Sequence, residues 1–354
     1  MPRCNALDNH AVASIEGRWK PCCRFGDFST KMKVEEYTLK QYKESDYFQN
    51  IVSTMQDGWH IGCRKCQLDE SMNKKSLRQK MNEELSGNGK LEYLELSLSK
   101  QCNLRCRMCG PAFSSSWSGL IKNNPEISDL IYSGEKINLS LNNIFKDVDI
   151  TELKMIKYLG GEPFITTEIH DLFELLDREQ ILENIEFHVA SNGTLFPKKL
   201  IKYLKRFNKI KLHLSIDGVG TNNEYIRDGK TWKDITKNIE KWKEYRSKYD
   251  NIELYILTTV QAYNLHQISE LKNFSEQNDI IFQTHMLWGP EQLSIHALPL
   301  EYLREIEDNE NLSWVNISRS DPILFENFKK YTLSLDAVMK KNIKDVIPDL
   351  YKYF

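Results

Sequence analysis

Three cysteines at short spacing are the residues of this sequence most able to do chemistry. Cys102, Cys106 and Cys109 lie in the run C-N-L-R-C-R-M-C. Soft thiolates bind iron–sulfur clusters, and a cubic [4Fe–4S] cluster contains four irons. Three thiolates leave one iron open to a reactant, as a catalytic metal site does and a closed structural site does not. The spacing predicts a reactive cluster, and the alternative is a structural zinc site completed by a distant fourth ligand.

The other five cysteines all precede this run. Cys4, Cys22, Cys63 and Cys66 could form a complete four-ligand set, which leaves Cys23 over. Clustered cysteines in a chain whose N-terminus lacks an apolar signal-like segment favour metal ligation over disulfides, and we expect a reducing cytoplasm. The spacing of these four residues permits either an iron–sulfur cluster or a Cys4 zinc site.

The composition sets bounds on function. Of the 354 residues, 40% are hydrophobic and 28% are charged, which is typical of a globular protein. No run of about 18 apolar residues occurs, so we expect no membrane association. The net charge of −2 gives no electrostatic reason to expect nucleic acid, although it leaves an RNA substrate open.

From residue 91 onward, candidate strands and amphipathic helices alternate. This alternation predicts an α/β fold with a parallel sheet and right-handed crossovers. The candidate strands are 91–99, 153–159, 185–191, 210–217, 252–260 and 280–288, and the helices include 167–176, 232–245 and 265–275.

Several of these strands carry polar residues on one face. Glu95 and Ser97 alternate with leucines, His188 alternates with Phe187 and Val189, and His213 lies between Leu212 and Leu214. A closed eight-stranded barrel is filled with branched apolar side chains. The pattern therefore favours a curved, partly open barrel whose interior binds a polar ligand, and edge or solvent-facing strands are the alternative.

The C-x3-C-x2-C run at the end of the first strand resembles that of the radical S-adenosylmethionine (SAM) superfamily. The resemblance implies a partial (β/α)6 barrel in which the open iron binds the methionine end of SAM. An electron from the cluster then cleaves SAM to a 5′-deoxyadenosyl radical that abstracts a substrate hydrogen. Met108 stands where relatives often have an aromatic residue against adenine, and a thioether can also pack on a ring face.

Further motifs follow in order at strand ends. Gly160-Gly161-Glu162-Pro163 resembles the family's G-G-E-P segment, which implies acceptors for the SAM ammonium group, although an ordinary strand-to-helix turn would look the same. Ser191-Asn192-Gly193-Thr194 resembles a T-N-G-T turn near the SAM site. By the same resemblance, Ser215 could bind the ribose or carboxylate, Arg227 would pair with the SAM carboxylate through its guanidinium fork, and Asn264 is a weaker match.

The N-terminal cysteines resemble the twitch module, a shortened SPASM domain. The pattern is Cys4-x12-Gly17-x4-Cys22 followed by Cys63-x2-Cys66, with Cys23 a poorer fit than Cys22. The resemblance implies a second, auxiliary [4Fe–4S] cluster that could accept an electron from a substrate radical. Such modules usually follow the barrel, whereas here it precedes the barrel.

These patterns predict a domain order and a reaction class. We expect a twitch-like module at 1–70, a linker helix at 71–90, the radical SAM core at 91–290 and a helical extension at 291–354. The expected substrate is a peptide or small molecule, and the resemblance implies an electron donor such as flavodoxin or ferredoxin. The alternatives are an RNA- or nucleotide-modifying enzyme, with the Lys-rich stretch 198–211 as its basic surface, and a non-catalytic electron-transfer or metal-binding protein.

Overall fold

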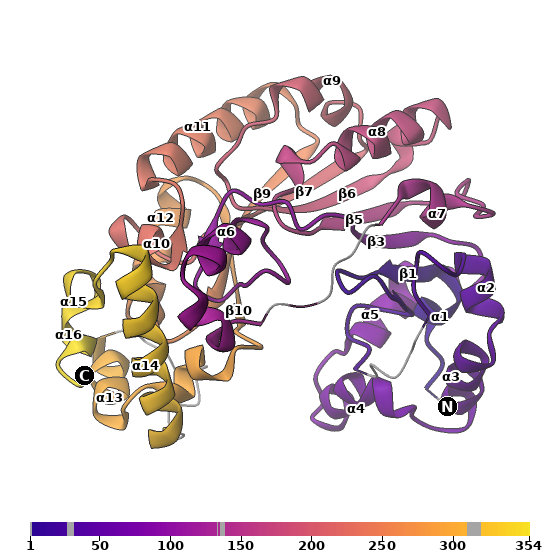
Figure 1. Ribbon diagram of the computed structural model, residues 1–354. Coiled ribbons are helices and arrows are strands. Elements are labelled where there is room, and N and C mark those ends of the chain that lie inside the picture. The colour runs from indigo at the N-terminus through magenta and orange to yellow at the C-terminus, as the bar shows by residue number, and fades with distance from the viewer. Residues whose placement is uncertain (1, 27–31, 133, 135–138, 310–319) are drawn as a thin grey trace. The chain divides into compact units, whose positions relative to one another are not determined.

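The computed structural model describes residues 2–26, 32–132, 134, 139–309 and 320–354. The chain divides into two compact units. The first unit comprises 1–99, 135–189 and 199–210, and the second comprises 100–134, 190–198 and 211–354. Figure 1 shows the elements of both units along the chain.

The first unit is built on a mostly parallel sheet in the order β2-β1-β3-β5-β6. Only β1 and β2 pair antiparallel, and they form a hairpin. On the far strand of this run, Phe187 contacts Phe173 of α8 at 5.1 Å between ring centroids, so α8 covers the face that bears Phe187. The strands are β1 (His10–Ala13), β2 (Trp19–Lys20), β3 (Tyr93–Ser97), β5 (Met155–Leu159) and β6 (Glu186–Ser191), and α8 spans Glu168–Arg178.

Short helices surround the N-terminal cysteines of this unit. The linker predicted at 71–90 contains the short helix α5, which begins at Leu77, and the preceding helix α4 ends at Ser71. Asn73 adopts a left-handed φ of 56°, and Ser76 makes a reciprocal capping box with Gln79, so the polar stretch divides. The helices are α1 (Asn5–Asn9), α2 (Leu39–Glu44), α3 (Asp46–Asp57), α4 (Arg64–Ser71), α5 (Leu77–Glu84), α7 (Leu141–Phe145) and α9 (Ile201–Leu204).

The N-terminal segment also contributes a strand to the sheet. Strand β1 pairs parallel with β3, and Val12 lies opposite Glu95 in the register. Glu95 and Ser97 are consequently buried, whereas Glu186 and His188 of β6 are only half-buried. The division into four domains stays a prediction, because the N-terminal residues and the first strands form one compact unit.

The second unit contains the strand order β7-β9-β10 and a separate two-stranded sheet, β4-β8. Strands β9 and β10 pair parallel, with Tyr255 opposite Ile281. All six strands predicted from residue 91 onward are therefore present in the two units, as are the three predicted helices. The elements are β4 (Arg105–Cys106), β7 (Lys209–Ser215), β8 (Arg227–Asp228), β9 (Ile252–Val260), β10 (Ile281–Met286), α6 (Ser116–Asn123), α10 (Thr221–Ile226), α11 (Trp232–Lys248) and α12 (Ile268–Gln277).

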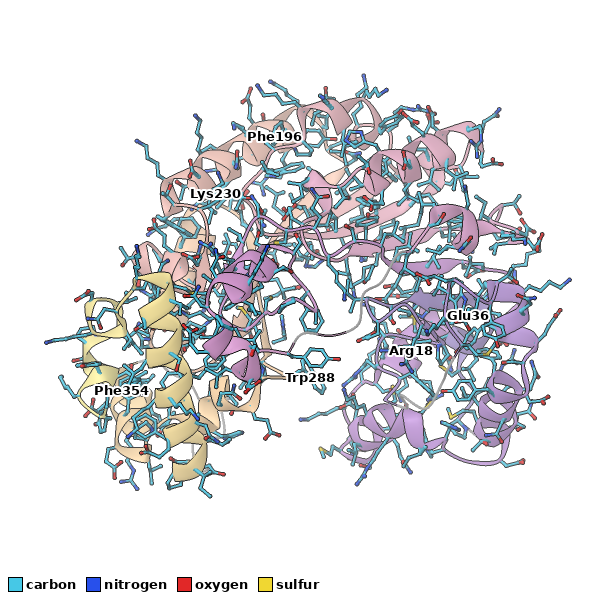
Figure 2. All side chains as sticks on the ribbon, viewed as in Figure 1. Arg18, Glu36, Phe196, Lys230, Trp288 and Phe354 are labelled. Carbon is cyan, nitrogen blue, oxygen red and sulfur yellow. The ribbon has the colours of Figure 1, made fainter. Side chains whose placement is uncertain are left out.

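The described part of the C-terminal extension is helical, as the sequence predicts. Helix α14 begins after Asp321, whose side chain caps it, and ends at Lys340 in a left-handed conformation. Phe354, labelled in Figure 2, packs on Phe325 and Phe328 of this helix at 6.0 and 5.8 Å between ring centroids. The helices are α13 (Leu300–Asn309), α14 (Pro322–Met339), α15 (Ile343–Val346) and α16 (Pro348–Tyr351).

Short 3-10 helices complete the described elements. They are η1 (Ile61–Cys63), η2 (Pro125–Leu130), η3 (Pro163–Ile165), η4 (Leu182–Asn184), η5 (Lys198–Leu200), η6 (Leu265–Gln267), η7 (Glu291–Leu293) and η8 (Ile295–Ala297). Across the described ranges, none of the helices combines the length and hydropathy needed to cross a bilayer.

Candidate functional site

The second unit brings the three cysteines of the C-x3-C-x2-C run onto one folded loop. The Cys109 N–H donates to the Cys106 carbonyl at 2.9 Å, and the Leu104 N–H points to the Cys102 sulfur at 3.5 Å. Cys106 belongs to β4, where it lies opposite Arg227 of β8. A hydrogen bond between the two thiols raises the pKa of Cys106 and lowers that of Cys109, and the charge of Arg227 favours the thiolate of each.

Three consecutive serines hold the start of this loop. Ser114 donates its hydroxyl to the Leu104 carbonyl at 2.6 Å, and Ser116 donates to the Cys102 carbonyl at 2.5 Å. Between them, Ser115 accepts the Cys102 N–H at 3.3 Å. These bonds satisfy backbone groups that no regular ladder would pair, so the loop has a defined shape without a helix or long strand.

The Ser191–Thr194 turn contacts the same loop. The Asn192 amide donates to the Cys102 sulfur at 3.8 Å and to the Asn103 side-chain oxygen at 2.9 Å. The Asn192 oxygen accepts from Thr194, and Asn103 donates back to the Thr194 hydroxyl at 2.8 Å. Asn192, predicted from its motif alone, therefore lies against the first cysteine of the loop.

Arg227 is buried next to the thiols and is paired with Asp217. Its Nη1 lies 2.6 Å from Asp217 Oδ2, and Asp217 has no exposed surface. Burial opposes the charge of Arg227, but the neighbouring Cys106 and Asp217 raise its pKa, so it stays cationic. Its Nε has no hydrogen-bond partner among the described residues. The sequence pattern contained Asp217 in the S-I-D-G motif but gave no reason to pair it with Arg227.

Ser215 and Met108 also belong to the second unit. Ser215 is the last residue of β7 and is half-buried, two residues before Asp217, and Met108 is half-buried between Arg107 and Cys109. Asn264 is fully buried, and its amide donates to the carbonyls of Asp217 and Thr259 at 2.9 Å each. Asn264 thus supports the turn after β7 through its own hydrogen bonds.

The Gly160–Pro163 loop belongs to the first unit, at the end of β5. Gly160 has a φ of +141°, and a Cβ there would lie 2.6 Å from the Ser99 carbonyl oxygen, so only glycine fits. The Gly161 N–H donates to that same oxygen at 3.0 Å. Glu162 is fully buried and accepts the Phe164 N–H at 3.1 Å, and Pro163 begins η3. Glycine is therefore required at position 160, because the backbone there lies close to the backbone of Ser99.

The first unit also gathers Cys4, Cys22, Cys63 and Cys66. The Cys22 loop packs on the Cys63 segment, because the Gly26 N–H donates to the Gly62 carbonyl at 2.9 Å. Burial, reinforced by neighbouring thiols of the set, raises the pKa of Cys4 to about 11 and that of Cys63 to about 12. The pKa of Cys22 is raised for the same reasons, with Cys4 and Cys63 among the neighbours.

Cys23 faces a different environment from its neighbour. Burial raises the pKa of the Cys23 thiol to about 12, and the negative charge of Glu95 adds to this rise. Glu95 is 1% exposed and lies 3.3 Å from the His10 Nε2 and 3.2 Å from the Lys157 ammonium. Burial opposes the Glu95 anion, but the hydrogen bond from His10 and the charge of Lys157 lower its pKa. Sequence reasoning missed this cluster because no pattern showed that β1, which carries His10, pairs with β3, which carries Glu95.

In the described part of the chain, no three His, Cys, Asp or Glu side chains converge as a site for one metal ion. A cubic cluster is wider than one ion, because each of its thiolates binds a different iron. The donor chemistry of the cysteine loop fits such a cluster: it offers three soft sulfurs, and the cation of Arg227 favours the thiolates of two of them.

Comparison with known proteins decides the family. Residues 96–274 match the model of the radical SAM superfamily, which is half of the chain. The chain belongs to the radical SAM superfamily of enzymes. Its α/β fold with a mostly parallel sheet is consistent with the partial (β/α)6 barrel of that superfamily, whose members use a [4Fe–4S] cluster and SAM.

Individual relatives are distant. A GTP 3′,8-cyclase of Desulforamulus reducens is 28% identical over 161 residues, which cover 43% of this chain and 44% of the cyclase. The radical SAM cyclopropyl synthase TigE of Paramaledivibacter caminithermalis is 24% identical over 197 residues, or 51% of this chain and 41% of the synthase. This chain thus spans less than half the length of either relative. The solved structure of native anSMEcpe with bound AdoMet gives a TM-score of 0.44 at 18% identity, covering 65% of this chain and 63% of that one.

Proposed function

We propose that this radical SAM enzyme cleaves SAM at a [4Fe–4S] cluster ligated by Cys102, Cys106 and Cys109. The cluster and SAM, when bound, supply a 5′-deoxyadenosyl radical that takes a hydrogen atom from a peptide or small-molecule substrate. The observation that carries the proposal is that Arg227 of β8 lies opposite Cys106 of the cysteine loop, where its positive charge favours the thiolates of Cys106 and Cys109. The loop leaves one iron of the cube without a protein thiolate.

The surrounding residues of the second unit have distinct roles in this proposal. Arg227 donates its unpaired Nε to the SAM carboxylate, while Asp217 holds the other edge of its guanidinium. Asn192 donates to the sulfur of Cys102, and such hydrogen bonds tune the potential of a cluster. Met108 packs on adenine, and Ser215 binds the ribose or carboxylate.

In the first unit, the Gly160–Pro163 loop receives the SAM ammonium group. Gly160 and Gly161 allow close approach of the backbone, and Glu162 offers a buried carboxylate at the same loop. Glu162 already accepts the Phe164 N–H through one oxygen, which fixes the direction of the side chain.

We further propose that Cys4, Cys22, Cys63 and Cys66 ligate an auxiliary [4Fe–4S] cluster that accepts an electron from the substrate radical. The thiols of Cys4, Cys22 and Cys63, whose pKa values are raised, are costly to ionise without a metal, and metal binding displaces their protons. Cys22 is the ligand because it interacts with Cys4 and Cys63, whereas Cys23 interacts with Glu95 and Lys157. The cation of Arg78 lies near Cys4 and Cys66 and offsets part of the thiolate charge.

A polar substrate is favoured by the sheet face opposite α8 in the first unit. Glu95, Lys157 and His188 share one row of the register on β3, β5 and β6. His188 lies 2.6 Å from Glu186, and its side chain is 16% exposed. When a substrate radical loses an electron, it also loses a proton. On this face of the sheet, His188 is a group that can accept the proton.

Metal analysis and a product assay test both halves of the proposal. The protein is reconstituted anaerobically, its iron and zinc are measured, and it is then incubated with dithionite and SAM. About eight irons per chain with 5′-deoxyadenosine formed supports both clusters. About four irons with one zinc would make the N-terminal site structural. Iron-loaded protein that forms no deoxyadenosine would contradict the enzymatic proposal.

A further inference from the structure

Helix α14 contacts the cysteine loop of the second unit through Arg107. This residue lies between Cys106 and Met108, and none of its side chain is exposed. A guanidinium is charged at every accessible pH, so a fully buried one needs an anionic partner and hydrogen-bond acceptors. Arg107 finds its anionic partner on α14, more than two hundred residues along the chain.

The Arg107 side chain is held on several sides. Its Nη2 lies 2.5 Å from Asp336 Oδ1, and its Nε donates to the Tyr225 carbonyl at 2.9 Å. The guanidinium carbon lies 3.7 Å from the centroid of the Tyr225 ring and 5.6 Å from that of Tyr263, within reach of cation–π attraction. The planar fork of arginine suits these contacts because its donors are spread over separate nitrogens, whereas a lysine ammonium has its three donors on one nitrogen.

The main chain of Arg107 is held as well. Its N–H donates to the Ile226 carbonyl at 2.8 Å, and its carbonyl accepts the hydroxyl of Tyr331 at 2.6 Å. Tyr331 is a buried residue of α14, and Cys109 lies near enough to add to the rise in its pKa that burial causes. Helix α14 therefore fixes both the side chain and the carbonyl of the residue between two of the cysteines.

A second ion network joins the loop to the residues after α14. Asp228 Oδ2 lies 2.7 Å from Arg105 Nη2, and its Oδ1 lies 2.9 Å from the Lys341 ammonium. Asp336 uses its second oxygen to accept the Ile343 N–H at 2.7 Å, at the start of α15. Both arginines of the cysteine run are thus connected to the C-terminal helices.

We propose that α14 is a positioning element for the cluster-binding loop, with Arg107 and Asp336 as the positioning residues. The inference rests on the proposed function, since it assigns these residues a role toward the same cluster. The pair sets the orientation of Cys106 and Cys109. It also keeps the net charge beside the cluster near zero, because the Arg107 cation is balanced by the Asp336 anion.

The charge balance gives a test that a purely structural role would not pass. Asp336→Asn leaves an uncompensated buried cation, which stabilises the more negative reduced cluster and raises its reduction potential. Arg107→Met removes the cation, so the potential does not rise. The double variant restores neutrality and the wild-type potential. The measurement is an EPR-monitored redox titration of the reconstituted protein. A potential that fails to rise in Asp336→Asn, or that rises in Arg107→Met, overturns the electrostatic half of the proposal.

Arg107→Lys separates positioning from charge. It keeps the cation but loses the fork, so we expect the rate of deoxyadenosine formation to fall about tenfold or more while the potential stays close to wild type. Tyr331→Phe removes one hydrogen bond to the loop and should reduce the rate less. Arg246→Met, which removes an exposed pair with Asp279, is the matched control and should leave the rate unchanged. A wild-type rate in Arg107→Lys overturns the positioning role.

Failure of this inference can be told from failure of the proposed function. Wild-type protein must show a cluster whose EPR spectrum changes on addition of SAM, together with deoxyadenosine formation. If it shows neither, the proposed function has failed. If it shows both, and the Arg107 and Asp336 variants behave like Arg246→Met, only the role of α14 is refuted. Where an Arg107 variant does not fold, Tyr331→Phe still tests the contact, because circular dichroism can establish that its fold is intact.

Discussion

The two cysteine sets of this protein differ in how they are prepared for a metal. In the second unit, a hydrogen bond between two thiols of the C-x3-C-x2-C loop lowers the pKa of Cys109 while it raises that of Cys106, and the cation of Arg227 favours the thiolate of each. In the first unit, burial raises the pKa of Cys4, Cys22 and Cys63.

This difference indicates which of the two cysteine sets would depend on a bound metal for folding. The cysteine loop is held by backbone and side-chain hydrogen bonds from Ser114, Ser115, Ser116 and Asn192 that do not involve a metal. Of the N-terminal thiols, Cys66 is buried and Cys4, Cys22 and Cys63 are half-buried, and metal ligation there would contribute directly to stability. We therefore expect the loop to be chiefly a reactive site and the N-terminal set to be partly a structural one.

The largest effect should come from removing one set at a time. Replacing Cys102, Cys106 and Cys109 together by Ala should reduce deoxyadenosine formation to the assay background and remove about half of the iron, because the open iron is lost. Replacing Cys63 and Cys66 by Ala should spare SAM cleavage but impair substrate turnover or folding. Deoxyadenosine assays and iron analysis of both variants make the comparison, and full substrate turnover by the second variant would contradict the electron-acceptor role.

Adjacent cysteines offer a sharper test of the N-terminal set. Cys22→Ala should lower the metal content of this site and the melting temperature, whereas Cys23→Ala should change neither, because Cys23 faces Glu95 and Lys157. Iron analysis with thermal unfolding of the holoprotein compares the pair. Equal losses in both variants would show that the assignment of Cys22 is wrong.

Gly160 tests whether the loop of the first unit that we propose to bind SAM can be damaged while both cysteine sets remain. In Gly160→Ala the new Cβ would meet the Ser99 carbonyl oxygen at 2.6 Å, at a φ of +141°. We expect a loss of about 2 to 3 kcal/mol in the free energy of unfolding, measured with denaturant. Gly119→Ala is the control, because this helical glycine has open space and Ala favours a helix. A harmless Gly160→Ala would refute the close approach.

Mild acid should weaken the C-terminal part of the second unit without altering a cysteine. Burial lowers the pKa of His266 from 6.5 to about 4, so the unfolded state binds more protons between these pH values. Stability from this group is complete above pH 6.5 and falls as the pH drops toward 4, by about 2 kcal/mol at pH 5. In His266→Gln the free energy of unfolding should depend less on pH between 4 and 6.5. An unchanged pH dependence would exclude this histidine as the cause.

Much of the fold was predictable because the signals are local. Strand alternation and helix periodicity depend on neighbouring residues, and all six strands from residue 91 were predicted. Helix α5 fills only part of the predicted linker, 71–90, because Asn73 and Ser76 act as stop and start signals inside a polar stretch. The pairing of β1 with β3 escaped prediction because the four residues of β1 are too few to show a period.

The sequence by itself determined the donor chemistry of this protein. Cys102, Cys106 and Cys109 are near neighbours in the sequence, as are Gly160 and Gly161. Each motif can therefore be recognised from the sequence without knowledge of the fold. Only the tertiary structure decided the partners of Arg107, Arg227 and Cys23. Asp336 lies 229 residues from Arg107, and Glu95 lies far along the chain from Cys23. Such pairs are chosen by strand order and helix packing, which bring distant segments into contact and bury charges that must then be matched.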